Sequence, residues 1–150
     1  MQNNPLYEQY SQIREYCEKL EGAAYDRYKL YSPATEEDIC SLENDNGVIL
    51  PEELKNWYML SNGFDMNSTA DILPISSIRA CPFGDLEELD KCFIVGHYIG
   101  DGSMLVIDNC GNFYEFDHGY HRLYKMSFRD FLVNWVIDRL EDNMYDAGLM

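Results

Sequence analysis

The sequence predicts an α+β fold: N-terminal helices, an antiparallel β-meander and a C-terminal helix packed on the sheet. Three observations predict it. Apolar residues recur at the helical period in the first third of the chain and again after residue 127. Between them, short runs rich in β-branched and aromatic residues are separated by glycine-bearing turns. The length of 150 residues suits a single domain spanning residues 1–150.

The first helix is expected over residues 5–20. Its apolar stripe consists of Leu6, Tyr10, Ile13, Cys17 and Leu20. The next segment, residues 23–33, fits either a short helix or an extended connector. Its three tyrosines, Tyr25, Tyr28 and Tyr31, fit either the edge of the core or an exposed interface, and we favour the core edge.

Two capped helices are expected to follow as a compact pair. Thr35 and Asp38 form the ends of a capping box, and Gly47 ends the first helix. Pro51 begins the second helix, which the sequence Ser61-Asn62-Gly63 ends. The large apolar side chains of this pair and of the last helix are expected to build the core. The predicted core residues are Leu50, Pro51, Leu54, Trp57, Gly63, Phe131 and Trp135.

After residue 63 the pattern changes to strands. Residues 71–76 read as a short strand, and Pro74 confines it to a sheet edge or to a strand end. Residues 76–90 read as an acidic loop with a helical turn. Four further strands are expected, over residues 93–99, 103–108, 112–117 and 121–126. The last helix begins at Ser127, whose side chain can cap it, and its apolar stripe should cover the sheet.

Acidic residues outnumber basic ones by 27 to 11, which gives a formal net charge of −16. A surface of this sign repels nucleic acid and anionic membranes and attracts a basic partner. The same charge also keeps a cytoplasmic protein soluble, and composition leaves both explanations open. Direct binding to nucleic acid is not expected, but an acidic protein can imitate nucleic acid and block a protein that binds it.

The five cysteines include no Cys-x-x-Cys pair. An odd number without such a pair favours reduced thiols over a disulfide framework, so we expect reduced thiols and a cytoplasmic protein. No segment combines a basic start with an apolar run, as a secretion signal does, and none has the length of a membrane span.

No motif for catalysis or for a cofactor is present. The sequence lacks the Gly-x-Ser-x-Gly pattern of a nucleophile, and Gly100-Asp101-Gly102 is too short to hold phosphate. Asp117, His118 and His121, with Cys110 nearby, are the sharpest cluster of metal-binding residue types. A stable zinc site needs four ligands, so we expect exposed turn histidines there and no metal. We therefore expect neither an enzyme nor a bound cofactor.

An ordered series of motifs resembles the SUKH superfamily. It runs from Glu-Asn-Asp-Asn-Gly (residues 43–47) through Leu-Pro-Glu-Glu-Leu (50–54) and Ser-Asn-Gly (61–63) to Ser-Phe-Arg-Asp-Phe-Leu (127–132). This superfamily includes the yeast cell-wall assembly regulator and many bacterial immunity proteins. The resemblance covers residue 35 onward. It implies a non-enzymatic protein-binding module, most often an immunity protein that neutralises a cognate polymorphic toxin, frequently a nuclease or another nucleic-acid-modifying enzyme.

Two alternatives are kept beside that interpretation. The first is a regulatory adaptor or scaffold of a cellular assembly, as the cell-wall assembly regulator suggests. The second is a hydrolase whose site has no recognised motif. For a toxin-binding surface, the candidates are acidic residues on loops close to the predicted sheet. These are Asp85, Glu87, Glu88 and Asp90 in the acidic loop, and Asp65, Asp71, Asp101 and Asp117 elsewhere.

Overall fold

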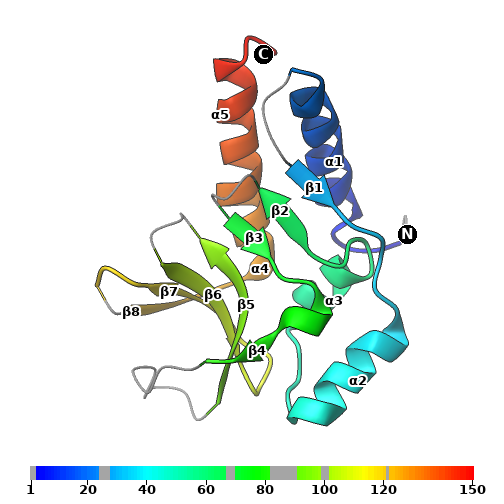
Figure 1. Ribbon diagram of the computed structural model, residues 1–150, viewed down its shortest axis with the longest axis vertical. Helices are drawn as coiled ribbons and strands as arrows, with labels where there is room; N and C mark the ends of the chain where they lie inside the picture. Colours follow the sequence, from blue (N-terminus) through cyan, green and yellow to red (C-terminus); the bar gives the residue numbers. More distant parts are fainter. Residues whose placement is uncertain (1–2, 24–27, 67–69, 82–90, 99–101, 121) are drawn as a thin grey trace.

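The computed structural model describes residues 3–23, 28–66, 70–81, 91–98, 102–120 and 122–150. Helices dominate the first third of the chain and its C-terminal end, and most of the strands lie between them (Figure 1). In the first half of the chain they are α1 (Tyr7–Gly22), β1 (Tyr28–Leu30), α2 (Glu36–Asn46), α3 (Glu52–Tyr58), β2 (Phe64–Met66), β3 (Ala70–Ile72), the 3₁₀ turn η1 (Ile75–Ser77) and β4 (Arg79–Ala80). The second half contains β5 (Cys92–Tyr98), β6 (Ser103–Asp108), β7 (Phe113–Asp117), β8 (Arg122–Met126), α4 (Phe128–Phe131), the π-helical η2 (Leu132–Ile137) and α5 (Asp138–Asp146).

The strands form one antiparallel sheet, which confirms the predicted α+β fold. Its order is β1-β2-β3-β5-β6-β7-β8, and β4 pairs with the first half of β5. The last four strands are the predicted meander, and each bound lies within one residue of the prediction. β3 lies between β2 and β5, so Pro74 follows the end of an interior strand and does not mark an edge.

A close backbone approach fixes the junction between β3 and β5. The register of β5 against β6 shifts between Ile94 and Gly96, which marks a bulge. A Cβ atom at Gly96 would collide with the carbonyl oxygen of Asp71. Only glycine therefore lets β3 and β5 pair at this point.

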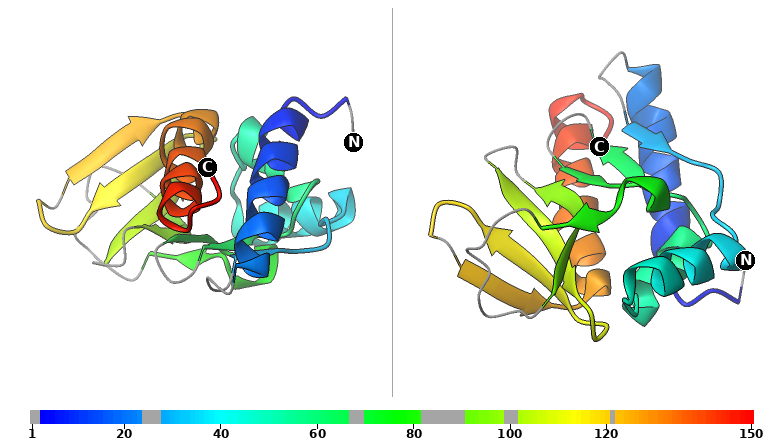
Figure 2. Two further views of the ribbon diagram at one scale, coloured as in Figure 1. Left: turned by 90° about the horizontal axis from the view of Figure 1, so that it is seen from above. Right: turned by 60° about the horizontal axis from the view of Figure 1, so that its bottom comes forward.

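The C-terminal helix is one rod of 19 residues, built from α4, η2 and α5. Ser127 caps its first turn by accepting a hydrogen bond from the Asp130 N–H at 2.9 Å, as predicted. Its first turn packs on the sheet, where the rings of Phe128 and Phe113 meet edge to face at 5.4 Å. Its later turns pack on α1, so the helix lies between α1 and the β5–β8 strands (Figure 2).

The core gathers around Trp57 of α3, which is fully buried. Its ring lies 5.9 Å from that of Tyr10 in α1, 6.2 Å from that of Phe64 in β2 and 6.1 Å from that of Phe128. The other predicted core side chains, apart from Trp135, are also buried. Trp135 is half-buried and stacks on Phe131 with the ring centroids 5.8 Å apart.

The helix pair confirms one predicted boundary and corrects another. Thr35 and Asp38 exchange both hydrogen bonds of a capping box, and Gly47 ends α2 in the left-handed conformation at φ 62°. The second helix was expected to end at residues 61–63, but α3 ends at Tyr58. Gly63 lies outside the helix but still has a positive φ of 114°. Glycine is also required there because a Cβ would lie 2.8 Å from the Ile72 carbonyl oxygen.

The segment before α2 is extended. β1 pairs with β2 and gives the sheet its first strand, so the connector interpretation of residues 23–33 holds for the described part of that segment. Tyr28 faces the core with only 5% of its surface exposed, and Tyr31 is half-buried. Residues 24–27, which include Tyr25, lie outside the described residues.

The prediction that all five cysteines are reduced is wrong for one pair. Cys81 and Cys92 form a disulfide, with Cα atoms 5.4 Å apart. The Cys81 N–H also donates to the Cys92 carbonyl oxygen at 2.9 Å, so the bridge joins two directly opposed positions where β4 runs along β5. Sequence spacing did not reveal the pair, because its 11-residue separation becomes a contact only when β4 returns to the sheet.

Candidate protein-binding surface

Three of the eight predicted partner-binding residues can be placed. Asp65 lies on β2, Asp71 on β3 and Asp117 at the end of β7. The other five lie outside the described residues: Asp85, Glu87, Glu88, Asp90 and Asp101.

Asp65 and Asp71 belong to a polar row across the sheet. The row consists of Lys29, Asp65, Asp71 and His97, each a direct cross-strand partner of the next. Like charges in direct opposition destabilise a strand pair unless another group compensates them. Here the carboxylate of Asp71 accepts a hydrogen bond from the His97 backbone N–H at 2.8 Å and lies 2.8 Å from the His97 Nδ1.

Tyr31 lies beside the two carboxylates of this row. Partial burial, followed by the nearby carboxylates of Asp65 and Asp71, raises the pKa of Tyr31 above its ordinary value. Lys29 covers the ring of the same tyrosine, with Nζ 5.0 Å from the ring centroid. We call Lys29, Tyr31, Asp65, Asp71 and His97 the sheet-face patch. It combines half-buried aromatic surface with carboxylates, which are the groups that protein interfaces use to bind basic partners.

Asp117 does not join this patch. It lies on β7, and β5 and β6 separate β7 from β3. Its Oδ1 accepts hydrogen bonds from the Gly119 N–H at 2.9 Å and the Tyr120 N–H at 3.3 Å, so its position is explained by the turn that it caps. Tyr120 in that turn is 79% exposed.

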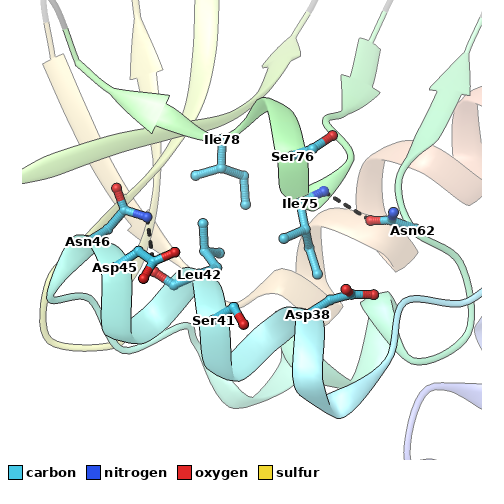
Figure 3. Close-up of a pocket in the computed structure, with 9 residues that line it drawn as sticks. All are labelled: Asp38, Ser41, Leu42, Asp45, Asn46, Asn62, Ile75, Ser76 and Ile78. Carbon is cyan, nitrogen blue, oxygen red and sulfur yellow. Dashed lines mark hydrogen bonds between the residues drawn. The ribbon is translucent and has the colours of Figure 1, made fainter.

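A second acidic surface surrounds α2. This helix carries five acidic residues among its 11 and no basic residue: Glu36, Glu37, Asp38, Glu43 and Asp45. A groove of about 350 Å³ runs between α2 and η1 (Figure 3). We call it the α2–η1 groove.

One face of α2 forms the first wall of the α2–η1 groove. Asp38, Ser41, Leu42, Asp45 and Asn46 line it at the spacing of a helix face. Ile75, Ser76 and Ile78 form the opposite wall, and Asn62 lies at one end. The Asn62 side chain holds η1 in place, because its Oδ1 accepts a hydrogen bond from the Ile75 N–H at 2.9 Å.

A second groove, of about 240 Å³, lies on the other side of α2, between it and α3. A lysine of the chain occupies the charged part of this groove. Lys55 Nζ lies 3.3 Å from a Glu43 carboxylate oxygen and 4.0 Å from one of Glu52. Glu43 also accepts a hydrogen bond from the Leu50 N–H at 2.9 Å. Two carboxylates of the α2–α3 groove, those of Glu43 and Glu52, are thus already engaged within the chain.

Histidines are the candidate metal ligands of the chain. Among the residues that the structure describes, no group of three or more His, Cys, Asp or Glu side chains is placed to hold a metal ion. His121 of the predicted cluster lies outside the described residues. Within the same described ranges, no helix has the length and apolar character needed to cross a membrane.

A comparison with protein families assigns the chain to a family. Residues 33–134 match the SMI1/KNR4 family (SUKH-1). The chain belongs to the SUKH-1 family. The matched segment of this SUKH-1 protein begins just before α2 and ends within the C-terminal helix, so it contains the α2–η1 groove and the sheet strands from β2 to β8. A comparison with curated proteins finds no match.

Two parts of the candidate surface were not predicted from the sequence. Lys29 and His97 were not assigned to a site, because only strand register places them beside Asp65 and Asp71. The α2–η1 groove was also missed. A signal for it was present, since Asp38 and Asp45 flank the inward-facing Leu42 at one helical turn and nearly one turn. That signal shows carboxylates at the edge of the buried face of α2, but it does not show what packs opposite.

Proposed function

We propose that this SUKH-1 protein is an immunity protein that neutralises a cognate polymorphic toxin by binding it directly, without catalysis. Membership of the SUKH-1 family over residues 33–134 is the observation that carries the proposal. The net charge of −16 favours a basic partner. A toxin that cleaves or modifies nucleic acid has such a surface, because it must hold a polyanion.

The proposed mechanism is electrostatic capture followed by burial of aromatic anchors. Opposite charge raises the association rate by about tenfold to a thousandfold at low salt. Carboxylates of the immunity protein then pair with lysine and arginine side chains that the toxin uses for nucleic acid. Half-buried tyrosines beside those carboxylates supply apolar contact. Once covered, the basic cleft of the toxin no longer reaches its substrate.

The sheet-face patch supports this mechanism on the described part of the chain. Asp65 and Asp71 lie together there, and Tyr31 lies close enough for both carboxylates to raise its pKa. The predicted contacts at Asp85, Glu87, Glu88, Asp90, Asp101 and Asp117 are retained in the proposal. We place the action in the cytoplasm, where a toxin of this class meets nucleic acid, with no cofactor required.

The test is co-expression with the toxin encoded beside this chain in its genome. Expression of the toxin alone should stop growth, and co-expression with this chain should restore it. Calorimetry on the purified pair should show saturable binding, and the toxin's activity on its substrate should fall as the complex forms. Failure to bind or protect, together with copurification of a cell-wall assembly complex, would favour the adaptor function. Turnover of a substrate by the purified chain would contradict both.

The contact surface is tested by charge neutralisation at one position. Asp65→Asn removes a carboxylate from the sheet-face patch, and Asp142→Asn removes one from an exposed position on α5. Both variants change the net charge equally. We expect Asp65→Asn to accelerate dissociation of the toxin complex and Asp142→Asn to leave dissociation unchanged. Equal dissociation rates for the two variants would remove the sheet-face patch from the proposed interface.

A further inference from the structure

We propose that the α2–η1 groove receives a lysine or arginine side chain of the partner protein, with the alkyl stem on its apolar floor and the cationic head on Asp45. The inference rests on the proposed function only for the identity of that partner, which is the toxin. The chemistry of the groove can be tested without the toxin.

The shape of the groove suits a side chain with an apolar stem and a polar head. The apolar residues of the two walls are Leu42 of α2 and Ile75 of η1, each with 8% of its surface exposed, together with half-buried Ile78, and we call them the floor of the groove. In Figure 3, Ile75 and Ile78 point toward α2, and Leu42 points from α2 toward them. Polar groups surround the floor, from Ser41 and Ser76 to the two aspartates. Long basic side chains bury their methylenes on such a surface and keep the charge at its rim.

The charge of the lining selects a cation. Asp38 and Asp45 contribute two carboxylates, and among the described residues no lysine, arginine or histidine lines the groove. Asp38 is partly engaged, because its Oδ2 accepts a hydrogen bond from the Thr35 N–H at 3.1 Å. Within the described ranges Asp45 forms no hydrogen bond or ion pair, although Lys91 Nζ lies close to Gly47 at the end of the same helix. Asp45 is therefore the carboxylate available to a partner.

The groove on the opposite side of α2 shows the same arrangement with its cation present. There the Lys55 side chain is mostly buried, with 29% of its surface exposed, and its head group contacts Glu43. The α2–η1 groove offers comparable carboxylates and apolar side chains, but the described residues that line it include no cation. A partner's basic side chain would complete it as Lys55 completes the other.

Other occupants fit less well. A second copy of this chain also carries a net charge of −16, so the two copies repel each other. An anionic ligand would meet the carboxylates of Asp38 and Asp45. An apolar side chain alone would bury these carboxylates without a counter-ion, which costs free energy. A basic side chain packs its alkyl stem on the apolar floor and pairs its charge with the carboxylates at the rim.

The first experiment uses n-butylguanidinium chloride, which mimics an arginine side chain, as a probe. It is titrated into ¹⁵N-labelled protein while amide chemical shifts are followed, and sodium chloride at equal ionic strength serves as the reference. Two variants add the same charge to α2. Ser41→Lys places an ammonium group in the groove itself, and Asn44→Lys places one on the same helix outside the lining. Both positions are exposed.

We expect saturable shifts at the amides of Ser41, Asp45 and Ser76 in the unmodified protein, with affinity in the millimolar range typical of so small a ligand. Asn44→Lys should keep these shifts, and Ser41→Lys should weaken binding at least about tenfold because its own cation competes. Shifts no larger than those caused by sodium chloride would overturn the inference. Equal titration of the two variants would also overturn it.

The second experiment uses the complete complex. Ser41→Lys should raise the Kd of the toxin complex at least about tenfold relative to Asn44→Lys, mainly through faster dissociation. Equal Kd values for the two variants would show that the toxin does not use this groove, and would overturn the docking inference while leaving the immunity function intact. If the unmodified chain binds no toxin, the proposed function fails, and the guanidinium titration still decides the chemistry of the groove.

Discussion

Trp57 connects four parts of the molecule through one side chain. Its ring contacts Tyr10 of α1, Phe64 of β2 and Phe128 at the start of the C-terminal helix. Its Nε1–H points toward the Gly63 carbonyl oxygen at 3.4 Å, so the polar end of the ring is not left without a partner. A residue with neighbours in so many elements leaves a large space when it is truncated.

Trp57→Ala should lower the free energy of unfolding by about 3–5 kcal/mol, because it removes a fully buried ring and leaves a cavity. Urea unfolding followed by circular dichroism measures the change. Trp135→Ala is the control: it removes the same side chain from a half-buried position and should cost less. Equal losses for the two tryptophans would contradict the central position of Trp57.

Asp108 stabilises the β6–β7 turn through a set of hydrogen bonds. Its Oδ1 accepts from the Cys110 N–H at 2.8 Å and the Asn112 N–H at 3.0 Å. Its Oδ2 accepts from the Asn112 side chain at 2.8 Å and the Tyr114 hydroxyl at 3.0 Å. Burial alone would raise the pKa of Asp108, but these hydrogen bonds outweigh it and hold the pKa below its ordinary value.

Because the pKa of Asp108 is lower in the folded protein than in the unfolded chain, its contribution to stability depends on pH in a known direction. The carboxylate contributes stability above its unfolded pKa of about 4, and this contribution is lost as pH falls through the lower folded pKa. Asp108→Asn should therefore lower the free energy of unfolding at pH 7 by about 1–3 kcal/mol. The difference between the two proteins should shrink below pH 4. Urea titrations from pH 7 to pH 3 measure it, and a difference that does not change with pH would contradict the role of the charge.

At the scale of elements, the short strand β4 brings two cysteines together. It has two residues, pairs with β5 and is followed by the Cys81–Cys92 disulfide. Two of the three remaining cysteines, Cys40 and Cys110, are exposed, while Cys17 is buried on α1. Burial raises the pKa of the Cys17 thiol to about 12, which leaves it almost wholly protonated and unreactive in the folded protein.

These environments predict three different thiol counts. Without reductant, the folded protein should react with two equivalents of a thiol reagent, at Cys40 and Cys110, and the unfolded protein with three. After reduction and unfolding, all five cysteines should react. Absorbance with Ellman's reagent measures each count. Five reactive thiols in the unfolded, unreduced protein would show that Cys81 and Cys92 are not bridged.

At the scale of the whole molecule, charge is the dominant property. A net charge of −16 acts over distances longer than any single contact, and salt screens it. The acids are also unevenly placed, since α2 carries five of them without a base. Long-range attraction depends on the net charge and should affect the association rate. Local pairing depends on which surface carries the charge and should affect the dissociation rate.

Reversing Glu87, Glu88 and Asp90 to lysine should slow toxin association, most strongly at low salt, and leave the fold intact. The control reverses Asp138, Asp142 and Asp146, three exposed acids of α5, so the two variants have the same net charge. Stopped-flow kinetics separate the effects. Both variants should associate more slowly, and only the first should also dissociate faster. Identical kinetics would remove residues 87–90 from the contact surface.

Local signals in the sequence predicted most elements. The capping box at Thr35 and Asp38, the left-handed Gly47 and the cap at Ser127 each depend on residues within four positions of one another. The meander was equally predictable, because its turns carry glycine and its strands are rich in β-branched and aromatic residues. The end of α3 was misplaced, since Ser61-Asn62-Gly63 also suits a helix end, and Gly63 serves a contact with β3 instead.

The sequence by itself determined the fold class and the sign of the charge, because periodicity, caps and composition need no knowledge of distant contacts. It also determined the family, through an ordered series of motifs that resembles the SUKH superfamily. Only the tertiary structure decided which acids meet. The Asp71–His97 pair spans 26 positions, and the α2–η1 groove joins residue 38 to residue 78. Strand register and helix docking set such contacts, and both follow from how the whole core packs, which no short stretch of sequence encodes.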